Sequence, residues 1–148
     1  MNLDFLFSFG FHIQAIVGSV IIWIFSWLWH DHIIVKPWLR WTGMTLEEAS
    51  ALHKGRLQLD LGLYLVSKII LSYTCLAILA LTSPATAIGY FVLGTIISIG
   101  LVFSSGVGPV IFENRNSGLW VLSSTLTTLS IYMLLAFQFF SVHVFFLY

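Results

Sequence analysis

Charged side chains are scarce in this chain, because Asp, Glu, Lys and Arg together make up only 8% of its 148 residues. A soluble domain carries about 25%. Three stretches, 5–29, 69–112 and 116–148, contain none of the four charged residue types. Since 59% of the residues are hydrophobic, this shortage argues against a water-soluble domain and predicts an integral membrane protein.

Other chemistries also lack the residues they need. Basic and acidic residues number 6 each, and no basic run is present to follow phosphates, so nucleic-acid binding is not expected. The single cysteine, Cys75, cannot form an intramolecular disulfide. No nucleophile–base–acid set, glycine-rich phosphate loop or H-E-x-x-H motif is recognisable. The residues therefore favour a protein without catalytic activity, and they identify no cofactor.

Four apolar stretches are long enough to cross a membrane, which takes about 20 residues. We expect helices at about 9–29, 60–81, 85–106 and 118–139. Thr82-Ser83-Pro84 separates the second helix from the third, and Gly108-Pro109 follows the third. The predicted fold is all-α, a single domain over 1–148. It is an integral membrane four-helix bundle with a short interfacial helix in the first cytoplasmic loop.

The orientation follows from the basic residues outside the predicted helices. They lie in the first and third loops, at Lys36, Arg40, Lys54, Arg56 and Arg115. The opposite side, formed by both termini and the 82–84 turn, carries none. The positive-inside rule therefore places both basic loops in the cytoplasm and both termini outside it.

The first loop contains two further helix signals. Thr45 and Glu48 have the spacing of a capping box, and we expect the helix that starts there to run through Arg56 into the second span. Before it, Pro37 is expected to open a short interfacial helix, with Trp38 and Trp41 at head-group depth.

Lys68 is the one charge deep inside an apolar stretch. A lysine at the centre of a membrane helix costs about 3 kcal/mol or more, so such residues usually face a bundle interior or a water-filled cavity. Helical spacing places polar residues around Lys68, in the cytoplasmic half of the bundle. The candidate ligand-binding residues are Lys68, Asp60, Tyr64, Ser123, Thr127 and His30.

Two interpretations of these polar residues stay open. In the structural one, Ser, Thr and Gly hold the helices together, and Lys68 extends toward the cytoplasmic interface near Asp60. In the functional one, the residues line a cytoplasm-facing pocket where Lys68 binds an anionic head group or a carbonyl-bearing ligand.

A metal site is a further hypothesis. His30-Asp31-His32, with His53 later in the same loop, is the one metal-like cluster in the sequence. In a helix His30 and His32 point about 200° apart, so joint ligation requires an extended segment. Haem ligation by His12 and His30 is a further alternative, but about 27 Å separates them along a helix, so they could not share one haem.

Short motifs resemble a known family. Trp29-His30 and the run Lys36-Pro37-Trp38-Leu39-Arg40-Trp41-Thr42-Gly43-Met44-Thr45 resemble its W-Y-x-P…G-K-x-W-x-x-x-x-G-x-T signature. Phe112-Glu113-Asn114-Arg115 is similar to its F-E-G-R turn. This is the family of small bacterial membrane proteins catalogued as domain of unknown function 1761. The resemblance implies four helices and a bacterial inner membrane, and it implies no activity and no functional residues.

Three function classes follow from the sequence. The favoured class is a structural or accessory membrane subunit, with a lipid or hydrophobic-ligand pocket near Lys68. Its expected partners are membrane lipids and either further copies of the chain or other proteins of a membrane complex. The second class is a small transporter or binding protein for an anionic solute. The third is a metal- or haem-binding redox protein with His30, His32 and His53 as ligands.

Overall fold

The computed structural model describes residues 9–112 and 117–141, and all the regular elements in these ranges are helical. The all-α prediction is therefore confirmed. The elements are α1 Phe9–Trp29, the π-helix η2 His30–Ile34, α2 Val35–Thr42, α3 Leu46–His53, α4 Leu57–Thr82, α5 Ala87–Ile97, the π-helix η3 Ser98–Phe103, α6 Ser104–Phe112 and α7 Ser117–Phe140.

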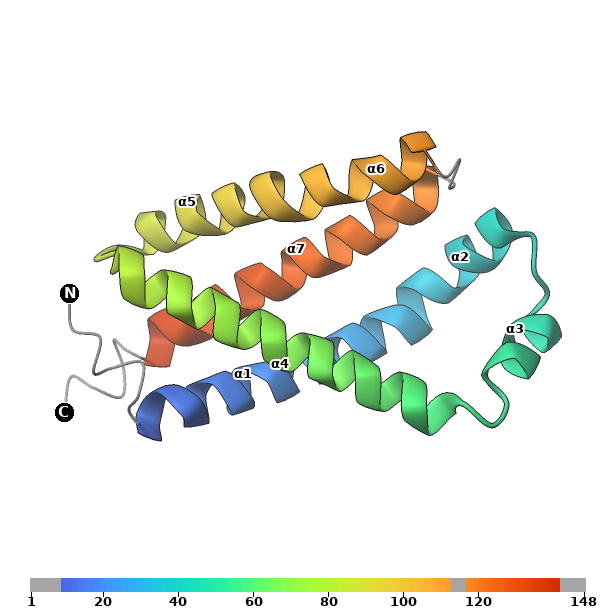
Figure 1. Ribbon diagram of the computed structural model, residues 1–148, viewed down its shortest axis with the longest axis horizontal. Helices are drawn as coiled ribbons and strands as arrows, with labels where there is room; N and C mark the ends of the chain where they lie inside the picture. Colours follow the sequence, from blue (N-terminus) through green and yellow to red (C-terminus); the bar gives the residue numbers. More distant parts are fainter. Residues whose placement is uncertain (1–8, 113–116, 142–148) are drawn as a thin grey trace.

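The long elements lie side by side as rods (Figure 1). One rod is α1–η2–α2, the second is α4, the third is α5–η3–α6 and the fourth is α7. Helix α7 contacts each of the other three rods, and α1 packs along α4. The rods α1–η2–α2 and α4 cross and then diverge toward the end where α3 lies (Figure 1).

Three helices in the described ranges are long and apolar enough to cross a membrane: Phe9–Thr42, Leu57–Thr82 and Ser117–Phe140. They contain the spans predicted at 9–29, 60–81 and 118–139. The third predicted span corresponds to a shorter apolar helix, Ala87–Phe103. These lengths and compositions are those of a small multi-spanning membrane protein.

Small residues allow the rods to approach closely. A Cβ atom placed on Gly18 of α1 would lie 2.8 Å from Leu134 Cδ2 of α7 and 3.1 Å from Ser72 Oγ of α4. The Ser72 hydroxyl donates to the Ala15 carbonyl at 2.8 Å, which ties α4 to α1. Close approach and hydroxyl hydrogen bonds are the usual means by which membrane helices associate.

The expected separate interfacial helix at Pro37 is wrong, because α2 continues α1 without a break. Proline has no N–H group and its ring clashes with the carbonyl four residues earlier. The π-helix η2 precedes it and shifts the hydrogen bonding, so that the Val35 N–H donates to the His30 carbonyl. One helix therefore runs from Phe9 to Thr42.

The capping box at Thr45 is confirmed. The Glu48 N–H donates to Thr45 Oγ1 at 3.2 Å, and the Thr45 N–H donates to Glu48 Oε2 at 2.8 Å. The expected continuation into the second span is wrong, since α3 ends at His53 and α4 begins at Leu57. Gly55 has φ +82°, a left-handed conformation that a continuous helix cannot contain.

The third helix also differs from its prediction. It begins at Ala87, with the Thr86 side chain accepting from the Gly89 N–H as N-cap, and it continues past Gly108-Pro109 to Phe112. Within it, η3 changes the hydrogen-bond register. The Ser104 and Ser105 hydroxyls donate to the Gly100 and Leu101 carbonyls, so these carbonyls keep a partner.

Candidate functional site

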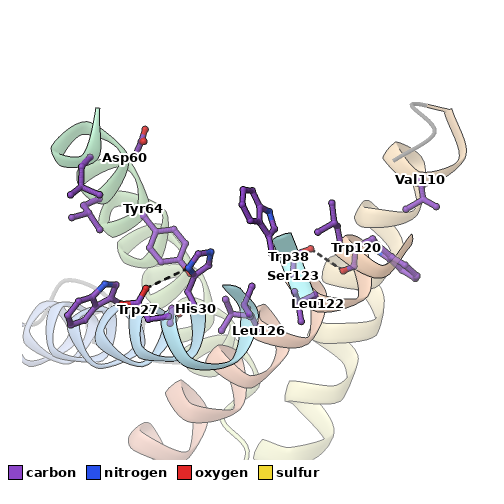
Figure 2. Close-up of a pocket in the computed structure, with 16 residues that line it drawn as sticks. Trp27, His30, Trp38, Asp60, Tyr64, Val110, Trp120, Leu122, Ser123 and Leu126 are labelled. Carbon is purple, nitrogen blue, oxygen red and sulfur yellow. Dashed lines mark hydrogen bonds and ion pairs between the residues drawn. The ribbon is translucent and has the colours of Figure 1, made fainter. Parts of the chain in front are cut away.

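A cavity of about 950 Å³ lies where α4 diverges from the other rods. It opens between α1–η2–α2 on one side, α4 on the second and the start of α7 on the third (Figure 2). The lining residues are Ser26, Trp27, His30, Asp31, Ile34, Trp38, Leu57, Asp60, Leu61, Tyr64, Val110, Leu119, Trp120, Leu122, Ser123 and Leu126.

The floor of the cavity is the point where α1 and α7 meet. Ser26 Oγ and Ser130 Oγ are 3.4 Å apart, and both serines are buried. Beyond this contact the apolar core begins, with Ile22, Ile131 and Leu134 fully buried. The cavity is therefore closed toward the middle of the rods and open toward the end that carries α3.

Polar side chains in the lining are few, and two of them are carboxylates. His30 Nδ1 lies 3.9 Å from Asp31 Oδ1, and the two side chains are 51% and 49% exposed. Asp60 enters from the first turn of α4. Ser123 uses its hydroxyl within α7, donating to the Trp120 carbonyl at 3.0 Å. The lining contains two carboxylates and neither Lys nor Arg.

Lys68 does not line the cavity. Its side chain is only 5% exposed, and its Nζ lies 4.7 Å from the centroid of the Tyr64 ring. Tyr64 does line the cavity, and its ring points into the open space (Figure 2). The buried ammonium group is stabilised by the negative face of the aromatic ring.

The structure brings together four of the residues predicted to bind a ligand. Asp60, Tyr64, Ser123 and His30 all line the cavity. Thr127 lies apart from it, and its hydroxyl donates to the Ser123 carbonyl at 3.0 Å within α7. The hypothesis that Lys68 binds an anionic ligand stays a prediction. The charged side chains that line the cavity include two carboxylates, which have the same sign as such a ligand.

The described side chains do not converge in the way that the metal hypothesis requires. His30 and His32 lie in η2, a helical segment and not the extended one that joint ligation requires. His32 Nδ1 is 3.1 Å from the Leu28 carbonyl of its own helix. The described part of the chain contains no group of three His, Cys, Asp or Glu side chains placed to hold a metal ion. The His53 side chain lies outside what the structure describes, so its part in such a site stays a prediction.

An aromatic wall, formed by Trp27, Trp38 and Trp120, lines the cavity and is absent from the predicted site. Trp27, Ile34 and Trp38 line the cavity from one continuous helix, at spacings of seven and four residues. This pattern is visible only when 9–42 is treated as a single helix. The sequence predicts Trp38 at the membrane interface, because Pro37 favours a new helix start. Trp120 lines the cavity from the facing helix α7, and it is not among the candidate ligand-binding residues predicted from the sequence.

Comparisons with known proteins add no relative. No family model matches the chain, and no curated protein or solved structure matches it. The resemblance to the family catalogued as domain of unknown function 1761 therefore stays a prediction from the sequence motifs.

Proposed function

We propose that this protein crosses a bacterial inner membrane four times and binds a lipid-like ligand at its cytoplasmic end. The fourth span in this proposal is α5–η3–α6. It runs from 87 to 112, as long as α4, and contains no charged residue. It packs along α7, whose length and composition suit a span. The family resemblance, which implies four helices, agrees with this arrangement.

The cavity is the observation that carries the proposed function. Ligand sites are typically concave, about 300–1,000 Å³ in volume, and mainly apolar with a few polar groups. The cavity of about 950 Å³ falls in that range, and its walls are mostly Trp, Leu, Ile and Val, with a few polar side chains among them. Such a distribution suits an amphipathic molecule, whose apolar body contacts the walls and whose head group lies near His30, Asp31 and Asp60.

The orientation determines which leaflet supplies the ligand. The exposed basic residues of the first loop, Lys36, Arg40, Lys54 and Arg56, lie at the same end as the cavity. Under the positive-inside rule that end faces the cytoplasm. The cavity then opens toward the inner leaflet, between α4 and the rod α1–η2–α2.

Native mass spectrometry of the full-length protein, released gently from membranes, tests the proposal. We expect a retained lipid-sized mass on the wild type. Ser123→Trp would fill the cavity and remove that mass. Thr125→Trp is the matched control, because Thr125 is exposed on the same helix and does not line the cavity. Retention by both variants, or by neither variant nor the wild type, would count against a ligand in this cavity.

A structural or accessory subunit is the second candidate. It is favoured by the open side of the cavity, which a second copy of the chain or another membrane protein would close. The same mass spectrum reports the number of subunits. A bare dimer that dissociates on Ser123→Trp, with no small molecule retained, would favour this function over ligand binding.

The other two classes have weaker support. An anionic solute needs positive charge in its site, and the lining has neither Lys nor Arg. A metal or haem redox centre needs ligands that converge, and the described side chains provide no such group of three.

A further inference from the structure

The charge of the cavity restricts which ligand it accepts. Asp31 and Asp60 contribute carboxylates from two different rods, η2 and α4, and the lining adds no Lys or Arg. Carboxylates in the lining disfavour an anion, and complementary charge selects a partner of the opposite sign. The lining therefore disfavours a phosphate or carboxylate head group and favours a positive one.

The aromatic walls favour the same ligand. Trp27, Trp38 and Trp120 line the cavity from α1, α2 and α7. Indole rings attract cations through their negative faces, and the attraction strengthens when water is excluded. Carboxylates and indole rings in one mainly apolar cavity are a combination suited to substituted ammonium groups, which are positive, bulky and weakly hydrated.

Lys68 does not supply a competing anion site in the observed geometry. Its Nζ is directed at the Tyr64 ring, 4.7 Å from the centroid, and only 5% of the residue is exposed. An anion in the cavity would meet the Tyr64 side chain before the ammonium group. A cation held near Asp31 and Asp60 would need no rearrangement of Tyr64.

We infer that the cavity binds a cationic amphiphile, a molecule with a substituted ammonium or comparable lipophilic cation on an apolar body. This inference rests on the proposed function, since it names the head-group class of the ligand in the same cavity. The head group lies between Asp31 and Asp60, and the apolar body contacts Trp27 and the leucines of α7.

Two probes of matched shape and opposite charge test the inference. Tetraphenylphosphonium is a lipophilic cation, and tetraphenylborate is an anion of the same geometry. Each is titrated into the full-length protein in dodecyl maltoside, with protein-free micelles as background. We expect the cation to bind at least tenfold more tightly than the anion, since complementary charge selects between partners. Ser123→Trp should remove binding of the cation, because it fills the cavity.

Variants that remove single charges show which carboxylates contribute to binding of the cation. Asp31→Asn and Asp60→Asn should each weaken phosphonium binding about fivefold, the size expected for partly exposed charge pairs. Glu47→Gln is the matched control, because Glu47 is exposed on α3 and does not line the cavity. It should leave the affinity unchanged. Lys68→Met should not weaken cation binding, because it removes a like charge behind Tyr64.

The form of the cation is resolved in the same assay. Dodecylamine added to the micelles competes with the phosphonium probe if the ligand is a long-chain amine, and dodecanol, which has the same chain and no charge, serves as the control. Competition by dodecylamine alone supports a long-chain ammonium ligand, and competition by neither supports a lipophilic cation without a long chain.

Three results would overturn the inference. Equal affinity for the two probes would show that the cavity recognises apolar bulk alone, which leaves the proposed function standing. Binding of tetraphenylborate only, lost on Lys68→Met, would assign the site to anions. Binding of neither probe, together with no retained mass in native spectra, would reject the cavity as a ligand site altogether.

Discussion

The ammonium group of Lys68 lies over the ring of Tyr64, 4.7 Å from its centroid. The two residues are one helical turn apart on α4, and helical side chains lean toward the N-terminus of their helix. Lys68 therefore extends toward the cavity while Tyr64 covers its charge. A lysine buried in the bundle is tolerated here because an aromatic face replaces part of its hydration.

Replacing Tyr64 tests whether its ring stabilises the buried ammonium group of Lys68. Tyr64→Leu removes the ring, and we expect the free energy of unfolding to fall by about 1–2 kcal/mol, the size of a partly desolvated cation–π contact. Tyr64→Phe keeps the ring and should cost less than half as much. Unfolding in mixed micelles measures both. Equal losses for the two variants would show that the hydroxyl, and not the ring, stabilises this region.

Gly18 should not tolerate a side chain. Its added Cβ would lie 2.8 Å from Leu134 Cδ2 and 3.1 Å from Ser72 Oγ, and both neighbours are buried. We expect Gly18→Ala to cost about 1–3 kcal/mol through overpacking. Gly62→Ala is the control, since no atom lies within 4 Å of its added Cβ. A shift in the unfolding midpoint for Gly18→Ala alone confirms the three-helix contact, and matched midpoints would contradict it.

The capping box makes α3 sensitive to acid. Hydrogen bonds from the Thr45 backbone and then from its side chain lower the pKa of Glu48 below its ordinary value. A carboxyl whose pKa is lower in the folded helix stabilises it above the unfolded pKa, about 4.3. That contribution is lost as pH falls through the lower, folded value. Chemical shifts of α3 should therefore move toward coil values in acid, and Glu48→Gln should remove this transition. If Glu48→Gln shows the same acid transition as the wild type, then a group other than Glu48 causes it.

Cysteine labelling tests the membrane crossings. In a Cys75→Ala background, we expect an impermeant maleimide to label Ala85→Cys on intact cells. Glu47→Cys and Ser117→Cys should react only after the cells are permeabilised. Labelling of Ser117→Cys on intact cells would mean that α5–η3–α6 does not cross, and the reverse pattern at all three sites would invert the orientation.

The sequence predicts the apolar spans well because their signal is local. Runs without charge locate α1, α4 and α7, and the Thr45–Glu48 spacing locates the start of α3. Each signal depends on a few neighbouring residues. The same locality explains the errors at Pro37 and at Gly108-Pro109, because a proline judged by its neighbours alone predicts a helix boundary. In α1–η2–α2 and in α5–η3–α6, a π-helix precedes the proline. No local sequence pattern predicts that change of hydrogen-bond register.

The candidate site was only partly predictable. Helical spacing placed Asp60, Tyr64, Ser123 and His30 near one another, because residues on one face at one depth must meet in a bundle. The position of Lys68 behind Tyr64 depends on a side-chain direction that spacing alone does not determine. The aromatic wall depends on α1 and α2 forming one helix, so the error at Pro37 concealed it.

The number of residues in the π-helix η2 determines the direction in which the side chains of α2 point. Each residue of an α-helix turns the following ones by about 100°. A π-turn holds one residue more than an α-turn, so η2 sets the rotational phase of everything from Val35 to Thr42. Removing a single residue from 30–34 would convert η2 into an α-turn and leave Trp38 at its present rotational phase. Substitutions that abolish the π-turn while keeping all five residues would instead rotate Trp38 by about 100°, away from the cavity, without unfolding the helix that bears it.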